Sequence, residues 1–187
     1  IHKIMEFINE KLEKFNSNTK NKKIAIIGLG ISNTPLIEYF KNNGSYVTVF
    51  DERTKEEMGE EIINKLEKEN VIYYLGKNCL DHLVGYDYIF RSPSIRPDKE
   101  EIVKEVERGA ILTSEIEKVI ELTPSTVIGV TGSDGKTTTT TLIYEILKKS
   151  GYKCFVGGNI GKPLFTQIKD MRKEDIVVLE LSSFQLM

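Results

Sequence analysis

A glycine-rich segment that runs into five threonines is the part of the chain best suited to chemistry. Residues 131–141 read TGSDGKTTTTT, between a β-branched apolar run and an apolar pattern of helical spacing. Backbone N–H groups of such a loop, a lysine ammonium and a threonine hydroxyl are the groups that bind nucleotide phosphates and Mg²⁺. The usual G-x-x-x-x-G-K-[ST] pattern is incomplete, because its first glycine would fall on Val130. We still expect this loop to bind ATP, through Gly132, Ser133, Asp134, Gly135, Lys136, Thr137 and Thr138.

One acid stands in an otherwise uncharged apolar run near the end of the chain. Glu180 lies in IVVLELSS, where an unpaired buried carboxylate would be costly. A magnesium ion that bridges phosphates normally has an acid at the end of a neighbouring strand. We therefore predict that Thr137 and Glu180 bind Mg²⁺, and that Lys136 and Glu180 are catalytic. An exposed position on an edge strand is the alternative for Glu180.

A second candidate phosphate site follows the first apolar run of the chain. GLG at residues 28–30 matches the start of the dinucleotide fingerprint G-x-G-x-x-G, but Asn33 replaces its third glycine. Asp51 stands about twenty residues further on, where that fold places a ribose-binding acid. The signal is weak by itself. It fits a nucleotide-binding oxidoreductase, but a dehydrogenase needs no second phosphate site, so the domain could instead bind a substrate that itself carries a nucleotide.

These residues need a parallel sheet to bring them to one edge. Apolar β-rich runs alternate with amphipathic helical patterns along the chain, which indicates an α/β protein. Strands are predicted within residues 24–30, 46–52, 71–75, 86–92, 110–114, 125–130, 153–157 and 175–183. Helices are predicted at about residues 1–15, 33–42, 55–69, 99–108, 115–122 and 136–149.

The pattern of alternation restarts at Thr123-Pro124-Ser125, which predicts a domain boundary. We expect a Rossmann-like parallel-sheet domain at residues 1–122, followed by the start of a P-loop-type ATP-binding α/β domain at residues 123–187. The second segment is short for an independent core and stops directly after a strand. We therefore expect the amino-terminal portion of a larger protein.

The composition excludes several classes of partner. The 187 residues carry a formal net charge of −2, so neither a nucleic-acid backbone nor a membrane surface is favoured. No apolar stretch approaches the ~20 residues that span a bilayer, and the charged amino-terminal stretch is unlike a signal peptide. Two cysteines and two histidines form no zinc-ligand pattern. We expect a cytoplasmic monomer.

Taken together, the motifs resemble those of the Mur ligases. The resemblance rests on GLG at 28–30, DER at 51–53, RSPSIRP at 91–97, TGSDGKTTT at 131–139, GGNIGKPL at 157–164 and ELSSFQL at 180–186. The TG-x-x-GKT motif is shared with folylpolyglutamate synthases, whereas GGNIG and ELSSFQL are similar to the family member that adds D-glutamate. The order and spacing of these motifs cover nearly the whole chain.

The resemblance implies a three-domain ligase that uses ATP and Mg²⁺ to join D-glutamate to UDP-N-acetylmuramoyl-L-alanine through an acyl phosphate. It implies that Asn159 and Ser182 lie near the reacting carboxylate, Asn159 with a catalytic role. The residues that it assigns to the uridine diphosphate portion are Ile31, Ser32, Asp51, Arg53, Ser92 and Pro93, with Glu52 beside them.

The sequence departs from the family pattern at Ser94, where a glycine is expected, and at Glu52, which is usually smaller. The resemblance also implies that later parts of the family's central domain and its carboxy-terminal domain lie beyond residue 187, so we expect the fragment alone to be inactive. An isolated nucleotide-binding module, another Mur ligase or a related amide ligase remain the alternatives. An oxidoreductase leaves the TGSDGKT motif and Glu180 unexplained.

Overall fold

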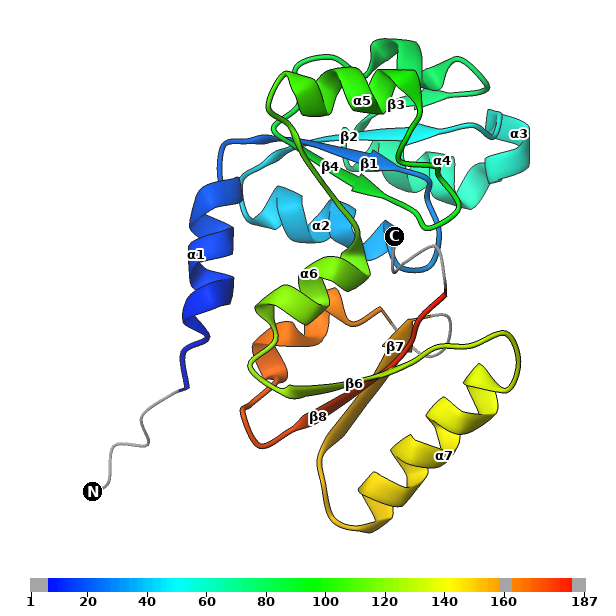
Figure 1. Ribbon diagram of the computed structural model, residues 1–187. Coiled ribbons are helices and arrows are strands. Elements are labelled where there is room, and N and C mark those ends of the chain that lie inside the picture. The colour runs from blue at the N-terminus through cyan, green and yellow to red at the C-terminus, as the bar shows by residue number, and fades with distance from the viewer. Residues whose placement is uncertain (1–6, 159–162, 183–187) are drawn as a thin grey trace. The chain divides into compact units, whose positions relative to one another are not determined.

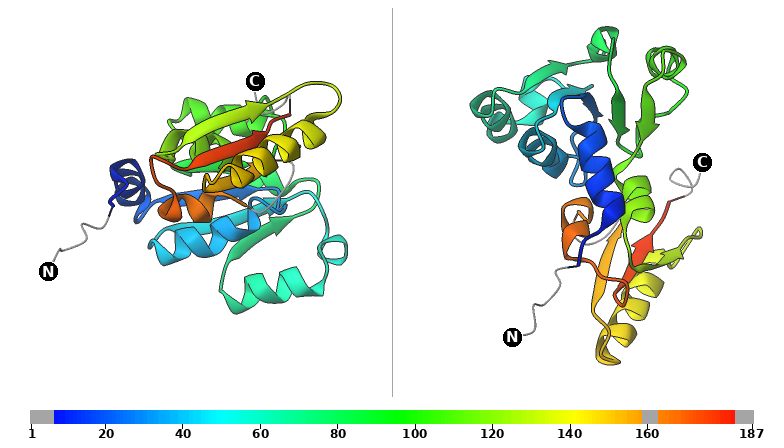
Figure 2. Two further views of the ribbon diagram at one scale, coloured as in Figure 1. Left: turned by 90° about the horizontal axis from the view of Figure 1, so that it is seen from below. Right: turned by 90° about the vertical axis from the view of Figure 1, so that its left-hand side faces the viewer.

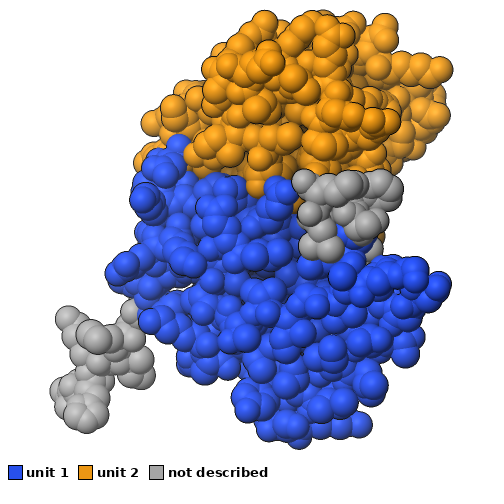
Figure 3. Space-filling model, in the orientation of Figure 1, with its two compact units in different colours: residues 1–18, 116–187 blue, residues 19–115 orange. Residues whose placement is uncertain are grey.

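The computed structural model describes residues 7–158 and 163–182. The chain divides into two compact units, each built on one parallel sheet (Figures 1 and 3). Unit 2 holds residues 19–115, and unit 1 holds residues 1–18 and 116–187. The predicted α/β class with parallel sheets is confirmed. Within the described ranges, no helix has the length and apolar character needed to cross a membrane.

Unit 2 contains a five-stranded parallel sheet with the order β3-β2-β1-β4-β5. Its strands are β1 (Lys23–Ile27), β2 (Tyr46–Asp51), β3 (Ile72–Leu75), β4 (Tyr88–Arg91) and β5 (Ile111–Thr113). The chain runs outward from β1 to β3 and then returns to place β4 on the other side of β1. In open α/β sheets such a reversal is where ligands bind, at the carboxyl ends of the strands.

Helices cover both faces of this sheet (Figure 1). They are α2 (Thr34–Asn42), α3 (Lys55–Met58), α4 (Glu60–Lys68), the 3₁₀ helix η1 (Cys79–His82) and α5 (Glu100–Glu107). On the α2 face Phe40 packs on Phe90, with ring centroids 5.0 Å apart. On the other face residues of η1 and α5 share a core cluster with Ile27 and Ile89. Burial on both faces explains why β1 and β4 are apolar runs rather than alternating ones.

Unit 1 contains a three-stranded parallel sheet with the order β6-β8-β7. The strands are β6 (Thr126–Val130), β7 (Cys154–Gly158) and β8 (Ile176–Glu180). The long helix α7 (Lys136–Lys149) runs along this sheet (Figure 2). The unit also holds most of α1 (Glu10–Thr19) and α6 (Glu115–Leu122), together with the 3₁₀ helix η2 (Phe165–Asp170).

Two predicted helices differ from the structure. The helix expected at residues 1–15 begins only at Glu10 among the described residues and continues to Thr19, because the Asn9 side chain accepts the Leu12 N–H at 3.2 Å and so caps its start. The helix expected at residues 55–69 is split at Gly59, whose φ of 85° is incompatible with a continuous helix. Each boundary was set by a local turn that the apolar pattern does not encode.

The division into units differs from the predicted boundary at residue 123. Contacts group α1 and α6 with the second sheet, because Asn9 Nδ2 donates to the Leu122 carbonyl at 2.8 Å and Phe15 packs edge-on against Phe165 at 5.9 Å. The first helix and α6 therefore pack within unit 1, although the sequence pattern associates them with the first sheet.

Candidate functional site

The predicted phosphate loop connects β6 to α7 in unit 1. Gly132 and Gly135 have positive φ values of 152° and 73°, and the helix starts directly after Gly135 without a side-chain cap. Lys136 Nζ donates to the carbonyl oxygens of Gly132 at 2.8 Å and Ser133 at 3.3 Å, so the ammonium lies over the loop. The loop is exposed. A lysine at the start of a helix is an arrangement suited to an anionic phosphate.

The predicted metal ligands Thr137 and Glu180 are in direct contact. Thr137 Oγ1 donates to Glu180 Oε2 at 2.9 Å. Glu180 ends the central strand β8, with Val130 of β6 and Gly158 of β7 as its neighbours in register. The residue is only 4% exposed, and the sequence alternative of an exposed edge position is therefore wrong.

Gly158 allows β7 to approach Glu180. A Cβ on Gly158, whose φ is 97°, would lie 2.0 Å from the Glu180 carbonyl oxygen, so no larger residue fits without a shift of the backbone. Ser182 follows two residues after Glu180 and is half-buried. Asn159, the other residue implied near the reacting carboxylate, lies outside the described residues.

The residues at this edge fit a divalent cation. Glu180 is a buried carboxylate that, among the described residues, receives a hydrogen bond only from Thr137. Such a charge is expensive to bury without a positive partner, and oxygen ligands are those that Mg²⁺ prefers. No group of three or more His, Cys, Asp or Glu side chains in the described ranges could hold a metal ion. Ions of this kind at nucleotide sites usually take their other ligands from phosphates and water.

In unit 2 the second candidate loop follows β1. Gly28 has a φ of 82°, and a Cβ on it would lie 2.9 Å from Cβ of Ser92. The Ser92 N–H continues the strand ladder by donating to the Ile27 carbonyl at 2.8 Å. Glycine at residue 28 therefore lets the loops after β1 and β4 meet closely, and this contact brings Ser92 and Pro93 beside the GLG loop.

Asp51 and Arg53 join the loop after β2 to the same GLG segment. Asp51 Oδ2 accepts the Leu29 N–H at 2.7 Å, and its two oxygens also accept the Arg53 Nε and Nη2 groups at 2.9 and 2.8 Å. Arg53 Nη2 donates in turn to the Leu29 carbonyl at 2.6 Å. Burial alone would raise the pKa of the Asp51 carboxyl, but the bonds from Arg53 and Leu29 outweigh it and lower that pKa. The pair is a prearranged, ionised link between the two loops.

The amino terminus of α2 presents free donors beside this link. Ile31 is 78% exposed and Ser32 is half-buried, and the structure gives their backbone N–H groups no acceptor within the described part of the chain. Asp51, the last residue of β2, and the loop residues after β1, β2 and β4 thus lie at the carboxyl edge of the first sheet; these loop residues are Ile31, Ser32, Arg53, Ser92 and Pro93. Ser94, the departure from the family pattern, has its hydroxyl 3.1 Å from that of Ser92.

Two buried side chains near this edge were missed as functional candidates. Asn33 donates to the GLG loop, and Arg91, which is 6% exposed, donates to the Ile95 carbonyl at 3.1 Å. Glu52, which the resemblance places beside the uridine diphosphate residues, pairs with Lys99. Asn33 could have been found, since a polar residue in place of a fingerprint glycine needs a partner. Burial of Arg91 in an apolar strand has no such signal.

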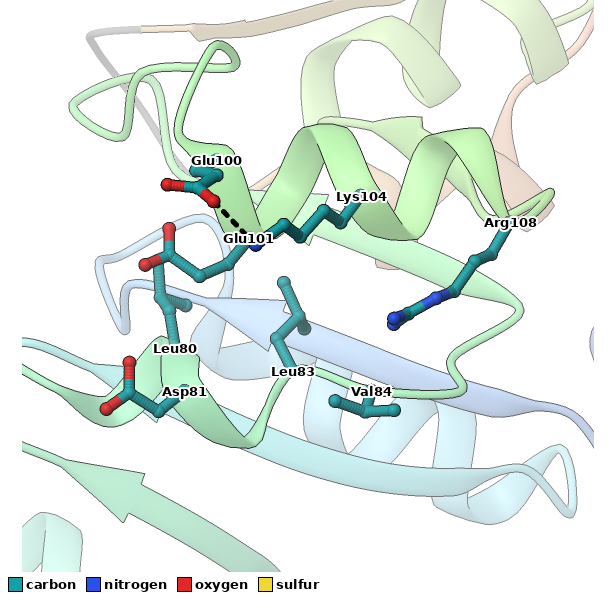
Figure 4. Close-up of a pocket in the computed structure, with 8 residues that line it drawn as sticks. All are labelled: Leu80, Asp81, Leu83, Val84, Glu100, Glu101, Lys104 and Arg108. Carbon is teal, nitrogen blue, oxygen red and sulfur yellow. Dashed lines mark hydrogen bonds and ion pairs between the residues drawn. The ribbon is translucent and has the colours of Figure 1, made fainter.

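The hollow shown in Figure 4 lies elsewhere in unit 2. It encloses about 340 Å³ between η1 and α5 and is lined by Leu80, Asp81, Leu83, Val84, Glu100, Glu101, Lys104 and Arg108. Lys104 pairs with Glu100, and Arg108 pairs with Glu105, so these wall cations already have carboxylate partners. None of the predicted site residues lines it.

Comparison with known proteins relates both units to one family. The profile of the Mur ligase MurD-like N-terminal domain matches residues 22–114, and that of the Mur ligase middle domain matches residues 130–187. The chain is 56% identical over 168 residues to the UDP-N-acetylmuramoylalanine–D-glutamate ligase of Clostridium acetobutylicum, covering 90% of this chain and 36% of that protein. It is 52% identical over 180 residues to the corresponding ligase of Clostridium botulinum strain Hall, covering 96% and 39%.

Among solved structures, a UDP-N-acetylmuramate:L-alanyl-gamma-D-glutamyl-meso-diaminopimelate ligase from Neisseria meningitides matches with a TM-score of 0.49 and 22% identity, covering 85% of this chain and 52% of that one. The chain spans less than two fifths of the length of the two clostridial relatives. The two profiles match residues of both units, and the sequence identity extends through both. The chain belongs to the Mur ligase family.

Proposed function

We propose that the protein is an ATP-dependent ligase that joins D-glutamate to UDP-N-acetylmuramoyl-L-alanine during peptidoglycan synthesis in the cytoplasm. The observation that carries the proposal is the hydrogen bond from Thr137, in the first turn of α7, to the buried Glu180 at the end of β8. It supports a site for the phosphates of ATP, in a chain that is 52–56% identical to enzymes named for this ligation. The activity belongs to the full-length protein.

The proposed chemistry solves a leaving-group problem. A carboxylate does not react with an amine, because its oxygen is not a leaving group. A carboxylate oxygen of the L-alanyl group attacks the γ-phosphorus of ATP, the bond to the β,γ-bridging oxygen breaks, and ADP leaves. The amine of D-glutamate then attacks the acyl-phosphate carbonyl, and the tetrahedral intermediate loses a proton and expels inorganic phosphate as the amide forms.

The residues of unit 1 would stabilise the transferring phosphoryl group. Catalysis of phosphoryl transfer depends on positioning and on neutralising charge, so Lys136 would contact the β- and γ-phosphates. The N–H groups at the start of α7 and residues 132–138 of the loop would bind the phosphate oxygens. Thr137 and Glu180 would hold Mg²⁺, which supplies charge neutralisation when bound. Ser182 and Asn159 would lie near the substrate carboxylate.

The residues of unit 2 would bind the uridine diphosphate portion of the substrate. The free N–H groups of Ile31 and Ser32 at the amino terminus of α2 are donors suited to a diphosphate. Arg53, which is held by Asp51, and the loop with Ser92 and Pro93 would contact the uridine. This assignment explains why one chain would have two phosphate-binding edges. The edge of unit 2 would bind the substrate, and the edge of unit 1 would bind ATP.

The test is a ligation assay on the full-length protein. UDP-N-acetylmuramoyl-L-alanine, Mg-ATP and one amino acid are incubated together, and mass spectrometry measures the product while ADP and phosphate are quantified. We expect one ADP and one phosphate per ligated D-glutamate, and no product with L-glutamate. Product formed with L-alanine or a diamino acid in preference to D-glutamate would refute the assignment, as would tight NADH binding without affinity for the UDP-sugar.

A further inference from the structure

Asn33 occupies the position of the third glycine in the dinucleotide fingerprint, and its side chain is turned into the GLG loop. The residue is 2% exposed. Its Nδ2 donates to the Gly28 carbonyl at 2.9 Å and lies 3.3 Å from the Ile27 carbonyl, to which it also donates. A glycine at this position would leave both carbonyl oxygens without these bonds.

The orientation of Asn33 differs from that of an ordinary helix cap. An asparagine at the start of a helix usually accepts a hydrogen bond from an N–H of the first turn. Asn33 precedes α2 with φ −85° and ψ −27° and makes no such bond. Its amide binds the loop instead, and the N–H groups of Ile31 and Ser32, just before the helix, keep no acceptor among the described residues.

The two carbonyls that Asn33 holds are at a junction of three segments. The Ile27 carbonyl also accepts the Ser92 N–H at 2.8 Å, and Gly28 lies against Ser92. The Gly28 N–H donates to the Phe50 carbonyl at 2.8 Å, next to Asp51. Movement of the GLG loop would therefore alter its spacing to the loops after both β2 and β4.

We propose that Asn33 is a positioning residue for the diphosphate of the substrate. By fixing the carbonyls of Ile27 and Gly28, it holds the loop so that the N–H groups of Ile31 and Ser32 face outward together. The proposal rests on the proposed function, since it takes a uridine diphosphate as the ligand. It also explains why the incomplete glycine fingerprint is compatible with phosphate binding.

The test compares Asn33→Gly and Asn33→Asp with Asn43→Asp in the full-length protein. Asn43 caps the other end of α2, where its Nδ2 donates to Thr19 Oγ1 at 2.9 Å, so it receives the same chemical change on the same helix. Isothermal titration measures the Kd for UDP and for uridine. We expect Asn33→Gly to weaken UDP binding about fivefold or more, the equivalent of one hydrogen bond. Asn33→Asp should weaken it further, because a carboxylate would face two carbonyls and repel the diphosphate.

Uridine binding should change less than about twofold in both Asn33 variants, and Asn43→Asp should bind UDP like the unmodified protein. Unchanged UDP affinity in Asn33→Gly, or an equal loss for UDP and uridine, would overturn the positioning role. Asn33→Gly decides the matter if the aspartate variant does not fold, since the dinucleotide fingerprint itself has glycine there.

Amide hydrogen exchange separates failure of this inference from failure of the proposed function. If the unmodified protein binds no UDP, the substrate assignment fails, but the role of Asn33 can still be measured. We expect faster exchange of the Gly28 and Ser92 N–H groups in Asn33→Gly. The Gly76 N–H, which donates to the Asp51 carbonyl at 2.9 Å, is the internal reference. If the exchange rates of all three amides are the same in Asn33→Gly as in the unmodified protein, Asn33 does not fix the loop.

Discussion

The two proposed phosphate-binding edges of the chain are built differently. In unit 2 the side chains of Asn33, Asp51 and Arg53 hold the GLG loop through hydrogen bonds to its backbone. These bonds form without a ligand. In unit 1 the proposed phosphate loop is exposed, and among the described residues Lys136 donates only to carbonyl oxygens of the same loop. The proposed substrate edge is thus prearranged, whereas the proposed ATP edge keeps its charged groups available to a ligand.

The difference extends to the buried carboxylates. Glu105 of unit 2 is 1% exposed and accepts from the N–H groups of Gly85 and Tyr86 at 2.7 and 3.0 Å and from Arg108. Glu180 of unit 1 is similarly buried but has one donor, the Thr137 hydroxyl, among the described residues. A carboxylate that the fold satisfies contributes to stability, whereas one that it leaves short of donors is better explained by a ligand.

The largest expected effect is on the rate of acyl-phosphate formation when Lys136, at the proposed ATP edge, is replaced. Lys136→Ala in the full-length protein should slow acyl-phosphate formation by about 10²-fold or more, since a positioned charge on the transferring group is lost. Rapid-quench measurement of ADP in the first turnover detects this step. Lys148→Ala near the far end of α7, where Lys148 lies over the Tyr144 ring, is the matched control and should react normally. Normal first-turnover rates in Lys136→Ala would remove this residue from catalysis.

The carboxylate comparison gives the second prediction. Glu180→Gln should raise the Mg²⁺ concentration needed for ATP binding by about 100-fold, because the proposed metal site loses a charged ligand. The free energy of unfolding of the ligand-free protein should rise by about 1 kcal/mol, because a buried charge with one donor becomes neutral. Titration of ATP at several Mg²⁺ concentrations and urea unfolding measure the two effects.

Glu105→Gln is the matched control for Glu180→Gln, and it should change the free energy of unfolding in the opposite direction. It should lower the free energy of unfolding by about 2 kcal/mol, since three donors lose an ionised acceptor. It should leave the Mg²⁺ dependence unchanged. If both variants destabilise the protein and neither alters Mg²⁺ dependence, Glu180 is a structural carboxylate like Glu105.

The prearranged edge of unit 2 is tested through Asp51. Asp51→Asn should lower the free energy of unfolding by about 2 kcal/mol at pH 7, since Leu29 and Arg53 lose a shared ionised acceptor. The pKa of Asp51 is lowered in the folded protein, so its stabilisation is fully present above the unfolded pKa of about 3.9 and is lost as the pH falls through the folded value. The difference between the two proteins should therefore be constant above about pH 5 and shrink below about pH 4.

Asp98 provides the exposed counterpart of Asp51. It pairs with Arg96, two residues away, through Nε at 2.9 Å and Nη2 at 2.5 Å, but both side chains are mostly exposed. Asp98→Asn should therefore change the free energy of unfolding by less than about 0.5 kcal/mol. Equal effects at Asp51 and Asp98 would show that burial and the Leu29 contact add nothing to the pair.

Much of this organisation could be predicted from the sequence, and the reasons for the failures are local. The strands were identified because buried parallel strands are continuous apolar runs, and the carboxyl ends of those strands fixed where Glu180 and Asp51 lie. The start of α1 at Glu10 and the break at Gly59 depend on turns that leave the apolar pattern intact. Asn33 contacts carbonyls five and six residues before it, and Arg91 contacts the carbonyl four residues after it. These contacts depend on the path of the loops after β1 and β4, which the apolar pattern does not specify.

The smallest expected effect concerns the run of threonines that begins α7. Thr140 is fully buried, and its hydroxyl has no hydrogen-bond partner in the described part of the chain. Thr140→Val keeps the branched shape and removes a polar group that lost its water on folding, so the free energy of unfolding should rise by about 1 kcal/mol. Thr141→Val, at the exposed neighbouring position, should change it by less than about 0.5 kcal/mol, and urea unfolding measures both. A loss of stability in Thr140→Val would mean that this hydroxyl has a partner in solution. A gain with unchanged ATP affinity would separate Thr137 and Thr138, which we propose contact the ligand, from Thr140, whose side chain only packs in the interior.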